Sequence, residues 1–225
     1  MKGYSSYYMC EDVAQVREMH HLVLANLRGY NSTFEIINAL AISQYRQYAI
    51  GYPPSIIELK NWHPECINKD YKYIMSLELT QSDIQLCQAC QFGYRNWHEV
   101  IMKDRPINHV FEQAIDYMIE GKLIKLKYLL TTNPDLLTAQ SAFQHKAGLL
   151  HYLAANGVET HRQITPYNAV EIARYLLQNG AAYEHQHNIY GGTCSVIDLI
   201  LTSAHPREAG VSEDLITLMR SYNAE

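Results

Sequence analysis

The chain has 225 residues, a formal net charge of −5 and an isoelectric point near 6.1. It is 48% hydrophobic and 18% charged, which is the composition of a folded protein rather than of a disordered one. The acidic balance gives no electrostatic reason to expect a nucleic-acid partner or an anionic membrane surface.

The first dozen residues contain no apolar segment typical of a secretory signal peptide. No apolar run approaches the roughly 18 residues of a transmembrane helix. Five cysteines at irregular spacing are typical of a reduced protein and not of a disulfide scaffold. We therefore expect a cytoplasmic location, and the sequence leaves open export by a route without an N-terminal signal.

Residues 1–105 predict a helical domain, because apolar residues recur at helical spacing and no segment alternates as a strand would. Gly29 and Gly51 stand where the first two helices end. Capping patterns mark four helix starts: Asp12 with Gln15, Ser32 with Glu35, Thr80 with Asp83, and Asn96 with Glu99. The expected helices cover about 13–27, 33–50, 54–60, 71–78, 81–92 and 97–101. Within the first, His20 is expected at the edge of the core and His21 in solvent.

Two short patterns in this domain could bind zinc. Residues 63–66 read HPEC, which places His63 and Glu65 as H-x-E, and residues 87–90 read CQAC. H-x-E followed by a CxxC pair is the outline of a zinc-dependent nucleobase deaminase, in which Cys87 and Cys90 would be ligands. That outline also has a proline directly before the first cysteine, where this sequence has Leu86.

Helix geometry favours a different role for the CxxC pair. Cys87 and Cys90 fall on the apolar face that also carries Ile84, and free cysteine is among the most buried residue types. We expect both thiols to be buried, reduced and free of metal. Trp97, at the start of the next helix, is expected to pack between the two halves of the protein.

The second half of the chain contains three similar segments, each with two apolar helices. They lie at 111–140, 149–182 and 192–224, and their second helices contain Leu129–Leu130, Leu176–Leu177 and Leu218–Met219. The paired residues are offset by 176 − 129 = 47 and 218 − 176 = 42 positions. Self-similarity at this spacing indicates stacked helical hairpins.

These segments resemble ankyrin repeats. Leu150, His151, Ala154, Ala155 and Gly157 match the LHxAAxxG part of an ankyrin unit, and Leu176, Leu177, Gly180 and Ala181 match its LLxxGA ending. The phrase FGYRNW at 92–97 resembles a segment that precedes ankyrin arrays in a class of bacterial proteins. The resemblance implies about three divergent repeats over 108–225, and it implies that His151 orders a turn by hydrogen bonding.

The repeats depart from the usual unit by two insertions. About 11 extra residues separate the helices of the second unit, around VETHRQITPYN, and the third unit is expanded around HPREAGVSED. Proline and capping residues within them indicate ordered loops. The whole chain is therefore predicted to be all-α, with a helical domain at 1–105 and an ankyrin-like domain at 108–225.

The favoured function is non-catalytic binding of a protein partner, since helical repeats present extended recognition surfaces. The sequence identifies neither the partner nor the oligomeric state, and no cofactor, metal, nucleic acid or membrane is expected. The candidate binding residues are polar and aromatic side chains on the loops: Glu159, His161, Arg162, Tyr167, Tyr183, His185, His187, Tyr190, Arg207 and Glu208.

Two alternatives remain at this point. One is a zinc-dependent hydrolase or deaminase that uses His63, Glu65, Cys87 and Cys90. The other is a secreted, host-directed effector that binds its target by the same surface. No glycine-rich phosphate loop and no GxSxG elbow supports a further class of enzyme.

Overall fold

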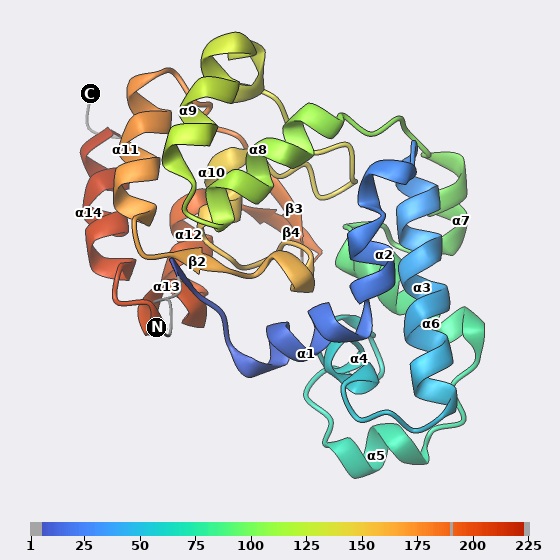
Figure 1. Ribbon diagram of the computed structural model, residues 1–225. Coiled ribbons are helices and arrows are strands. Elements are labelled where there is room, and N and C mark those ends of the chain that lie inside the picture. The colour runs from blue at the N-terminus through green and yellow to red at the C-terminus, as the bar shows by residue number, and fades with distance from the viewer. Residues whose placement is uncertain (1–5, 190, 223–225) are drawn as a thin grey trace, which may run out of the picture.

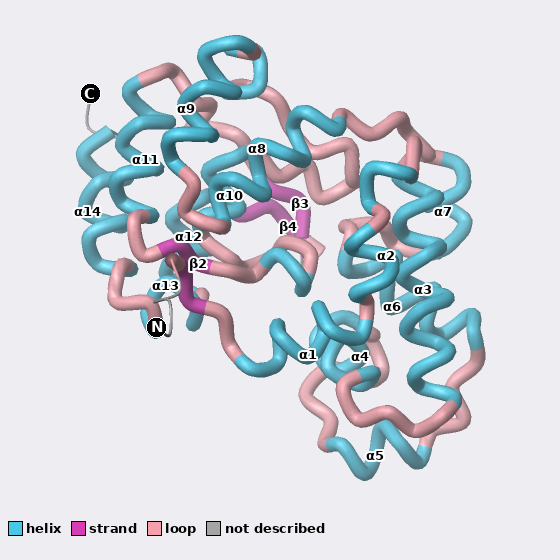
Figure 2. Tube along the Cα trace, viewed as in Figure 1, coloured by secondary structure: helices cyan, strands magenta, loops and turns pink. Residues whose placement is uncertain are grey.

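The computed structural model describes residues 6–189 and 191–222, and helices dominate it, as predicted (Figures 1 and 2). The first half of the chain, on the right in Figure 1, contains α1 (Glu11–Met19), α2 (His21–Ala25), the 3₁₀ turn η1 (Leu27–Gly29), α3 (Thr33–Ala49), α4 (Ser55–Trp62), α5 (Tyr71–Ser76), α6 (Gln81–Gln91) and α7 (Trp97–Met102).

The second half of the chain lies on the left in Figure 1. Its helices are α8 (His109–Ile119), α9 (Leu123–Thr132), η2 (Pro134–Leu137), α10 (Leu149–Leu153), η3 (Thr160–Arg162), α11 (Ala169–Gln178), α12 (Val196–Thr202), α13 (Ala204–Glu208) and α14 (Ser212–Tyr222).

Three of the four predicted caps are confirmed. The Ser32 hydroxyl accepts from Glu35 N, the Asn96 side chain accepts from Glu99 N, and Thr80 with Asp83 forms a capping box. The fourth is wrong, because α1 begins at Glu11 with Cys10 as its N-cap, which places two acidic residues in the first turn where they complement the helix dipole.

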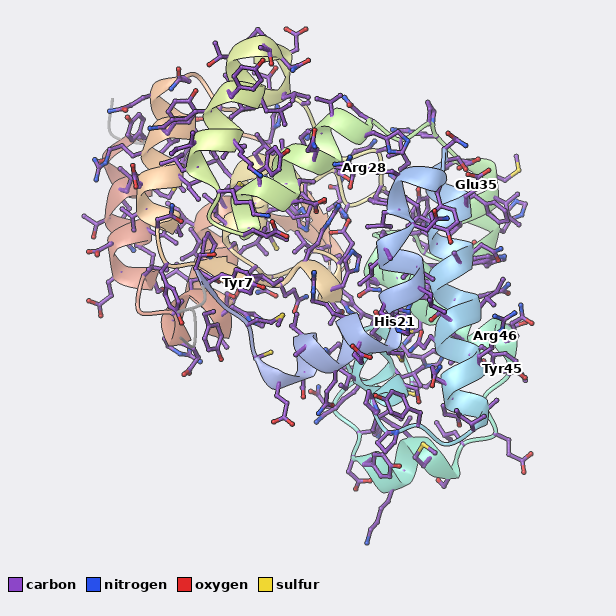
Figure 3. All side chains as sticks on the ribbon, viewed as in Figure 1. Tyr7, His21, Arg28, Glu35, Tyr45 and Arg46 are labelled. Carbon is purple, nitrogen blue, oxygen red and sulfur yellow. The ribbon has the colours of Figure 1, made fainter. Side chains whose placement is uncertain are left out.

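The expected first helix is also divided at His20, which is fully buried, while His21 is exposed as expected. On α3, the charged side chains of Glu35 and Arg46, labelled in Figure 3, are exposed.

Two small antiparallel sheets were not predicted. β1 (Tyr7–Tyr8) pairs with β2 (Thr165–Pro166), and β3 (His187–Ile189) pairs with β4 (Gly192–Cys194). Strands of two or three residues are too short to show an alternating pattern, and the partners in the first sheet are far apart in sequence. The β1–β2 pairing places the first described residues on the second half of the chain, from which the chain crosses to α1 (Figure 2).

The helices of the second half form packed pairs. α8 contacts α9, α10 contacts α11, and α12 contacts α14. α10 also contacts both α8 and α12, while α11 contacts α14, so neighbouring pairs lie side by side. The insertions are ordered as expected, since the first contains η3 and β2 and the second contains α13.

Aromatic packing joins the two halves. The rings of Phe92 and Phe143 lie 4.4 Å apart between centroids, and both are fully buried. Trp97, the expected anchor of this junction, is only partly buried, and its ring contact is with Phe34 in its own half. Phe92 makes the aromatic contact across the junction because Gly93, which follows it, turns the chain toward residues 144 and 145.

Among the described residues, no helix combines the length and the apolar character that crossing a membrane requires.

Candidate functional site

A buried polar network begins inside the first half of the chain, at Glu58 on α4. His20 Nε2 lies 2.9 Å from Glu58 Oε2, and Gln88 Nε2 donates to the same oxygen over 2.9 Å. Gln91 Nε2 donates to the other oxygen over 3.0 Å. All four side chains are fully buried. Because a buried carboxylate is costly unless it is hydrogen-bonded, these contacts hold α1, α4 and α6 together.

Thr160 extends this network into the second half. The Oε1 atom of Gln91 accepts hydrogen bonds from both the backbone N and the hydroxyl of Thr160, over 2.9 and 2.5 Å. The indole Nε1 of Trp62 donates to the Thr160 hydroxyl over 2.9 Å. The position of the Trp62 ring is therefore fixed from the opposite half of the molecule.

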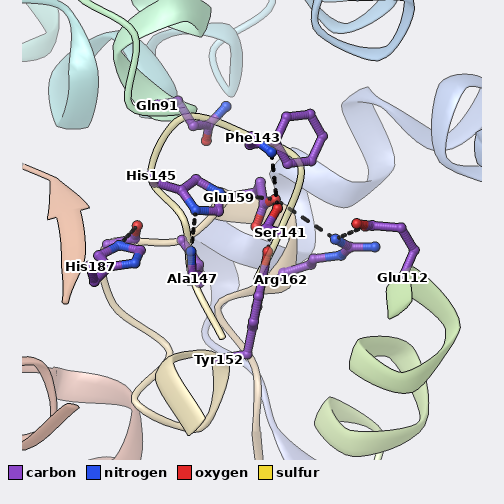
Figure 4. A network of polar contacts seen from close by, with 12 residues as sticks. Gln91, Glu112, Ser141, Phe143, His145, Ala147, Tyr152, Glu159, Arg162 and His187 are labelled. Atoms are coloured by element: carbon purple, nitrogen blue, oxygen red, sulfur yellow. Dashed lines mark hydrogen bonds and ion pairs between the residues drawn. The ribbon is translucent and has the colours of Figure 1, made fainter. Parts of the chain in front are cut away.

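Glu159, next in the chain, lies at the centre of a second group (Figure 4). Its Oε1 accepts from the Tyr152 hydroxyl over 3.2 Å and lies 3.4 Å from His145 Nε2 and 3.7 Å from Arg162 Nη1. Arg162 donates in turn to Glu112 Oε2 over 2.5 Å. Burial alone raises the pKa of a carboxyl, but the hydrogen bond from His145 and the charge of Arg162 hold the pKa of Glu159 below its ordinary value.

Three histidines attach the β3–β4 hairpin to this group. The ring centroid of His187, on β3, lies 5.2 Å from that of His145 and 5.2 Å from that of His151. Burial lowers the pKa of His151 to about 4 and that of His187 to about 3.

The hydrogen bonds fit three neutral rings. His145 and His151 each accept a backbone N–H at Nδ1, from Ala147 and Gly148, so the proton of each ring is on Nε2. His187 Nε2 donates to Gly157 O over 2.6 Å. The backbone N of residue 188 also donates to the carbonyl of His145 over 2.8 Å, which fixes the hairpin relative to α10.

The hairpin forms one wall of a cleft of about 750 Å³. The opposite wall comes from the first half of the chain, at the end of α4 and at the junction of α6 with α7. The cleft is lined by Asn61, Trp62, Pro64, Ile67, Cys90, Gly93, Tyr94, Arg95, Asn188, Ile189, Gly191, Gly192 and Thr193. We refer to this set as the inter-half cleft.

Gly93 explains how the two walls come so close. Its φ of +82° is a conformation that other residues rarely adopt, and a Cβ at this position would lie 2.5 Å from the backbone N of His145. His145 N also donates to the carbonyl of Phe92 over 3.1 Å. A glycine is therefore required where the α6–α7 junction meets the loop that carries His145.

The inter-half cleft has buried apolar side chains in its walls and exposed polar side chains at its rim. Trp62, Tyr94 and Ile189 are almost completely buried in its walls, whereas Arg95, Asn61 and Asn188 are exposed. None of the described residues that line it is Asp, Glu or His. Burial raises the pKa of the Cys90 thiol, which is opposite to the shift that activates a nucleophilic cysteine.

The expectation of a solvent-exposed binding loop is wrong for four of the candidate residues. Glu159 and His187 are fully buried, and His161 and Arg162 are 4% and 3% exposed. Burial of His161 lowers its pKa well below the ordinary value. The physical reason within the insertion is that Glu159 contacts His145, Arg162 contacts Glu112, and the His161 carbonyl accepts from Arg17, so these residues lie inside the molecule.

The remaining candidates differ in their exposure to solvent. Tyr167 and Arg207 are exposed, whereas Tyr183 and His185 are partly buried. Glu208 is also exposed, and Tyr190 lies outside the described residues. His151 has the structural hydrogen bonds that its pattern indicated, from Gly148 N to Nδ1 and from Nε2 to the carbonyl of His185.

The zinc pattern is not assembled into a ligand set. Among the described residues, no group of three or more His, Cys, Asp and Glu side chains could hold a metal ion. His63 is buried and its Nδ1 accepts from the backbone N of Glu65. Cys87 is fully buried, as predicted, but Cys90 is only partly buried because it faces the inter-half cleft. All five cysteines are free.

The sequence contained two weak signals for this cleft. Gly93, Tyr94 and Arg95 belong to the FGYRNW phrase, and Gly191–Gly192 is a turn signal. Neither indicated that these segments, almost a hundred residues apart, face one another.

Comparison of the chain with protein-family models, curated proteins and solved structures finds no match.

Proposed function

We propose that this protein is a non-catalytic binding protein that recognises a protein partner through the inter-half cleft. The observation that supports this most directly is the cleft itself, whose volume of about 750 Å³ suits one or two inserted side chains. Interfaces take much of their binding energy from aromatic or aliphatic anchors in well-packed pockets. Trp62 and Tyr94 supply the aromatic walls of such a pocket.

The three helix pairs α8/α9, α10/α11 and α12/α14 form, in this proposal, a short and divergent ankyrin-like stack over 108–225. Their side-by-side packing and the hydrogen bonds of His151 are consistent with it. Such stacks use the loops between helix pairs for recognition, and the β3–β4 hairpin is the connection between the second and third pairs.

A binding role accounts for the cleft better than catalysis does. A nucleophilic thiol requires a base or a cationic environment that lowers its pKa. Cys90 has instead a raised pKa, and the described lining of the cleft beside it includes no histidine or carboxylate. Five free cysteines suit a reducing compartment, and we propose the cytoplasm as the location.

The test is to fill the cleft. Thr193 is exposed and lines it, so Thr193→Trp places a large ring there, while Leu201→Trp places the same ring on exposed α12 outside the cleft. Wild-type protein and both variants are used to capture partners from a lysate of the source organism, and bound proteins are identified by mass spectrometry.

We expect wild type and Leu201→Trp to retain the same partner and Thr193→Trp to lose it. Matching circular dichroism and melting temperatures establish that all three proteins are folded. Retention of every captured protein by Thr193→Trp would refute the proposal that the cleft is the binding site.

A further inference from the structure

Resting on the proposed binding function, we propose that the inter-half cleft selects a protein segment with a large apolar side chain next to a carboxylate. In this proposal Arg95 determines the preference for the carboxylate. The apolar side chain enters between Trp62 and Ile189, and the acidic side chain meets Arg95 at the rim.

The charges around the cleft favour an anion. Arg95 is the only ionised side chain among the lining residues, because the described lining includes no Lys, Asp or Glu. Its intramolecular partner Glu99 is shared with Lys103, whose Nζ lies 3.1 Å from the same Oε1 atom. Two cations therefore share one carboxylate, so the group of Arg95, Lys103 and Glu99 carries a net positive charge.

Arg95 is also held in position while keeping free donors. Its Nε donates to Glu99 Oε1 over 2.7 Å, and its Nη2 contacts the same atom. Nη1 makes no hydrogen bond or ion pair among the described residues, and the side chain is 83% exposed. A guanidinium oriented in this way binds an incoming carboxylate with a smaller loss of side-chain entropy than a free arginine would.

The walls for the apolar side chain are equally fixed. The Trp62 ring is anchored through Nε1 to Thr160, and Tyr94 is 2% exposed. Ile189 is held on β3 between the ladder with β4 and the contacts of the neighbouring His187. A preformed apolar pocket binds an aromatic or branched side chain without reorganising first.

The rim suits a polypeptide rather than a buried small molecule. Pro64 and Ile67 continue outward from one wall as exposed residues, and Gly191, Gly192 and Thr193 do so from the other. A chain can therefore lie across the rim on both sides of an inserted side chain.

The experiment compares three blocked dipeptides: N-acetyl-Phe-Glu-amide, N-acetyl-Phe-Gln-amide and N-acetyl-Ala-Glu-amide. Each is titrated into ¹⁵N-labelled full-length protein, and amide and indole shifts are followed by NMR. We expect Phe-Glu to shift Trp62, Gly93 and Thr193, and to bind about threefold to fivefold more tightly than Phe-Gln, which is the upper part of the range of an exposed ion pair. Ala-Glu should bind more weakly than both.

Two matched variants assign the preference. Arg95→Gln should reduce the ratio of the Phe-Glu and Phe-Gln affinities to about one while Phe-Gln binding is retained. Lys103→Gln removes a charge from the same carboxylate without touching the cleft lining, so it should keep most of the ratio.

Equal affinity of Phe-Glu and Phe-Gln in the cleft would overturn the acidic preference and leave the proposed function standing. An equal reduction of the ratio of the Phe-Glu and Phe-Gln affinities by Arg95→Gln and Lys103→Gln would also overturn the inference. Arg95 would then act only through the overall charge of this region. Shifts confined to other regions, or none, also overturn the inference, while the capture experiment with Thr193→Trp decides the proposed function by itself.

Discussion

Replacing Arg162 with Met tests the buried ion network directly. Arg162 is 3% exposed, and its guanidinium lies 2.5 Å from Glu112 and 3.7 Å from Glu159. A third contact, at 3.4 Å, is with Asp116, which is about half exposed. Met keeps much of the length of the arginine side chain but removes its charge, so the two buried carboxylates lose their cation.

The loss of folding stability caused by Arg162→Met should be large. At an effective dielectric constant of about 20, two opposite charges about 4 Å apart attract by about 4 kcal/mol. Removing one partner of a buried ion pair generally costs about 3–5 kcal/mol, because the other charge stays buried. The exposed contact with Asp116 adds at most about 1 kcal/mol. Since whole proteins unfold at a cost of about 5–15 kcal/mol, Arg162→Met should lose a large fraction of the stability.

The pH dependence supplies a second readout. In the wild type the pKa of Glu159 lies below its ordinary value of 4.5, so its stabilising effect is present above that pH and is lost as the pH falls. Burial already raises the pKa of Glu112 in the wild type, and without Arg162 we expect the pKa of Glu112 and that of Glu159 both to rise. Both then take up protons in the native state as the pH falls from 7 to 5, and the variant gains stability relative to its unfolded state.

Urea unfolding followed by circular dichroism measures both effects. The difference in the free energy of unfolding between wild type and Arg162→Met should become smaller as the pH falls from 7 to 5. Arg207→Met, on an exposed arginine, is the control and should stay within about 0.5 kcal/mol of the wild type. A loss below about 1 kcal/mol for Arg162→Met, with no narrowing, would contradict the assignment of a buried network.

Three further predictions concern single residues around the cleft. Gly93→Ala should lower the free energy of unfolding by about 2–3 kcal/mol in thermal melts, because the added Cβ would lie 2.5 Å from a backbone atom. Gly210 has a similar φ but open space around it, so Gly210→Ala should lower the free energy of unfolding by only about 1 kcal/mol. The pKa of His187 is about 3 in the native state, so acid favours the unfolded state, in which this side chain takes up a proton more readily. His187→Gln should therefore reduce the fall in the free energy of unfolding between pH 6.5 and pH 4 by about 1 kcal/mol per pH unit. An unchanged dependence of that free energy on pH would contradict this. Iodoacetamide should modify Cys90 in the native protein before Cys87, because Cys87 is fully buried and Cys90 is only partly buried. Peptide mass spectrometry measures the two rates, and equal rates would contradict this difference in burial.

The sequence by itself determined most of the helices. Ser32, Thr80 and Asn96 mark helix starts because each caps a backbone N–H three residues away. Such contacts join residues that are close together in the sequence, so the sequence alone predicts them. Helical spacing of apolar residues likewise placed Cys87 in the core. The similarity of the three C-terminal segments predicted their paired helices.

Only the tertiary structure decided where the polar insertion lies. Residues 158–168 contain Glu159, His161 and Arg162, and charged residues on a loop are normally solvated. Here Glu159 meets His145 and Arg162 meets Glu112, and residues 158–162 are all buried. The inter-half cleft has the same origin, since its lining residues within 61–67, 90–95, 188–189 and 191–193 come together only after both halves have folded. Partners so far apart in sequence leave no periodic pattern, because their pairing depends on how whole helices pack and not on the spacing of neighbouring residues.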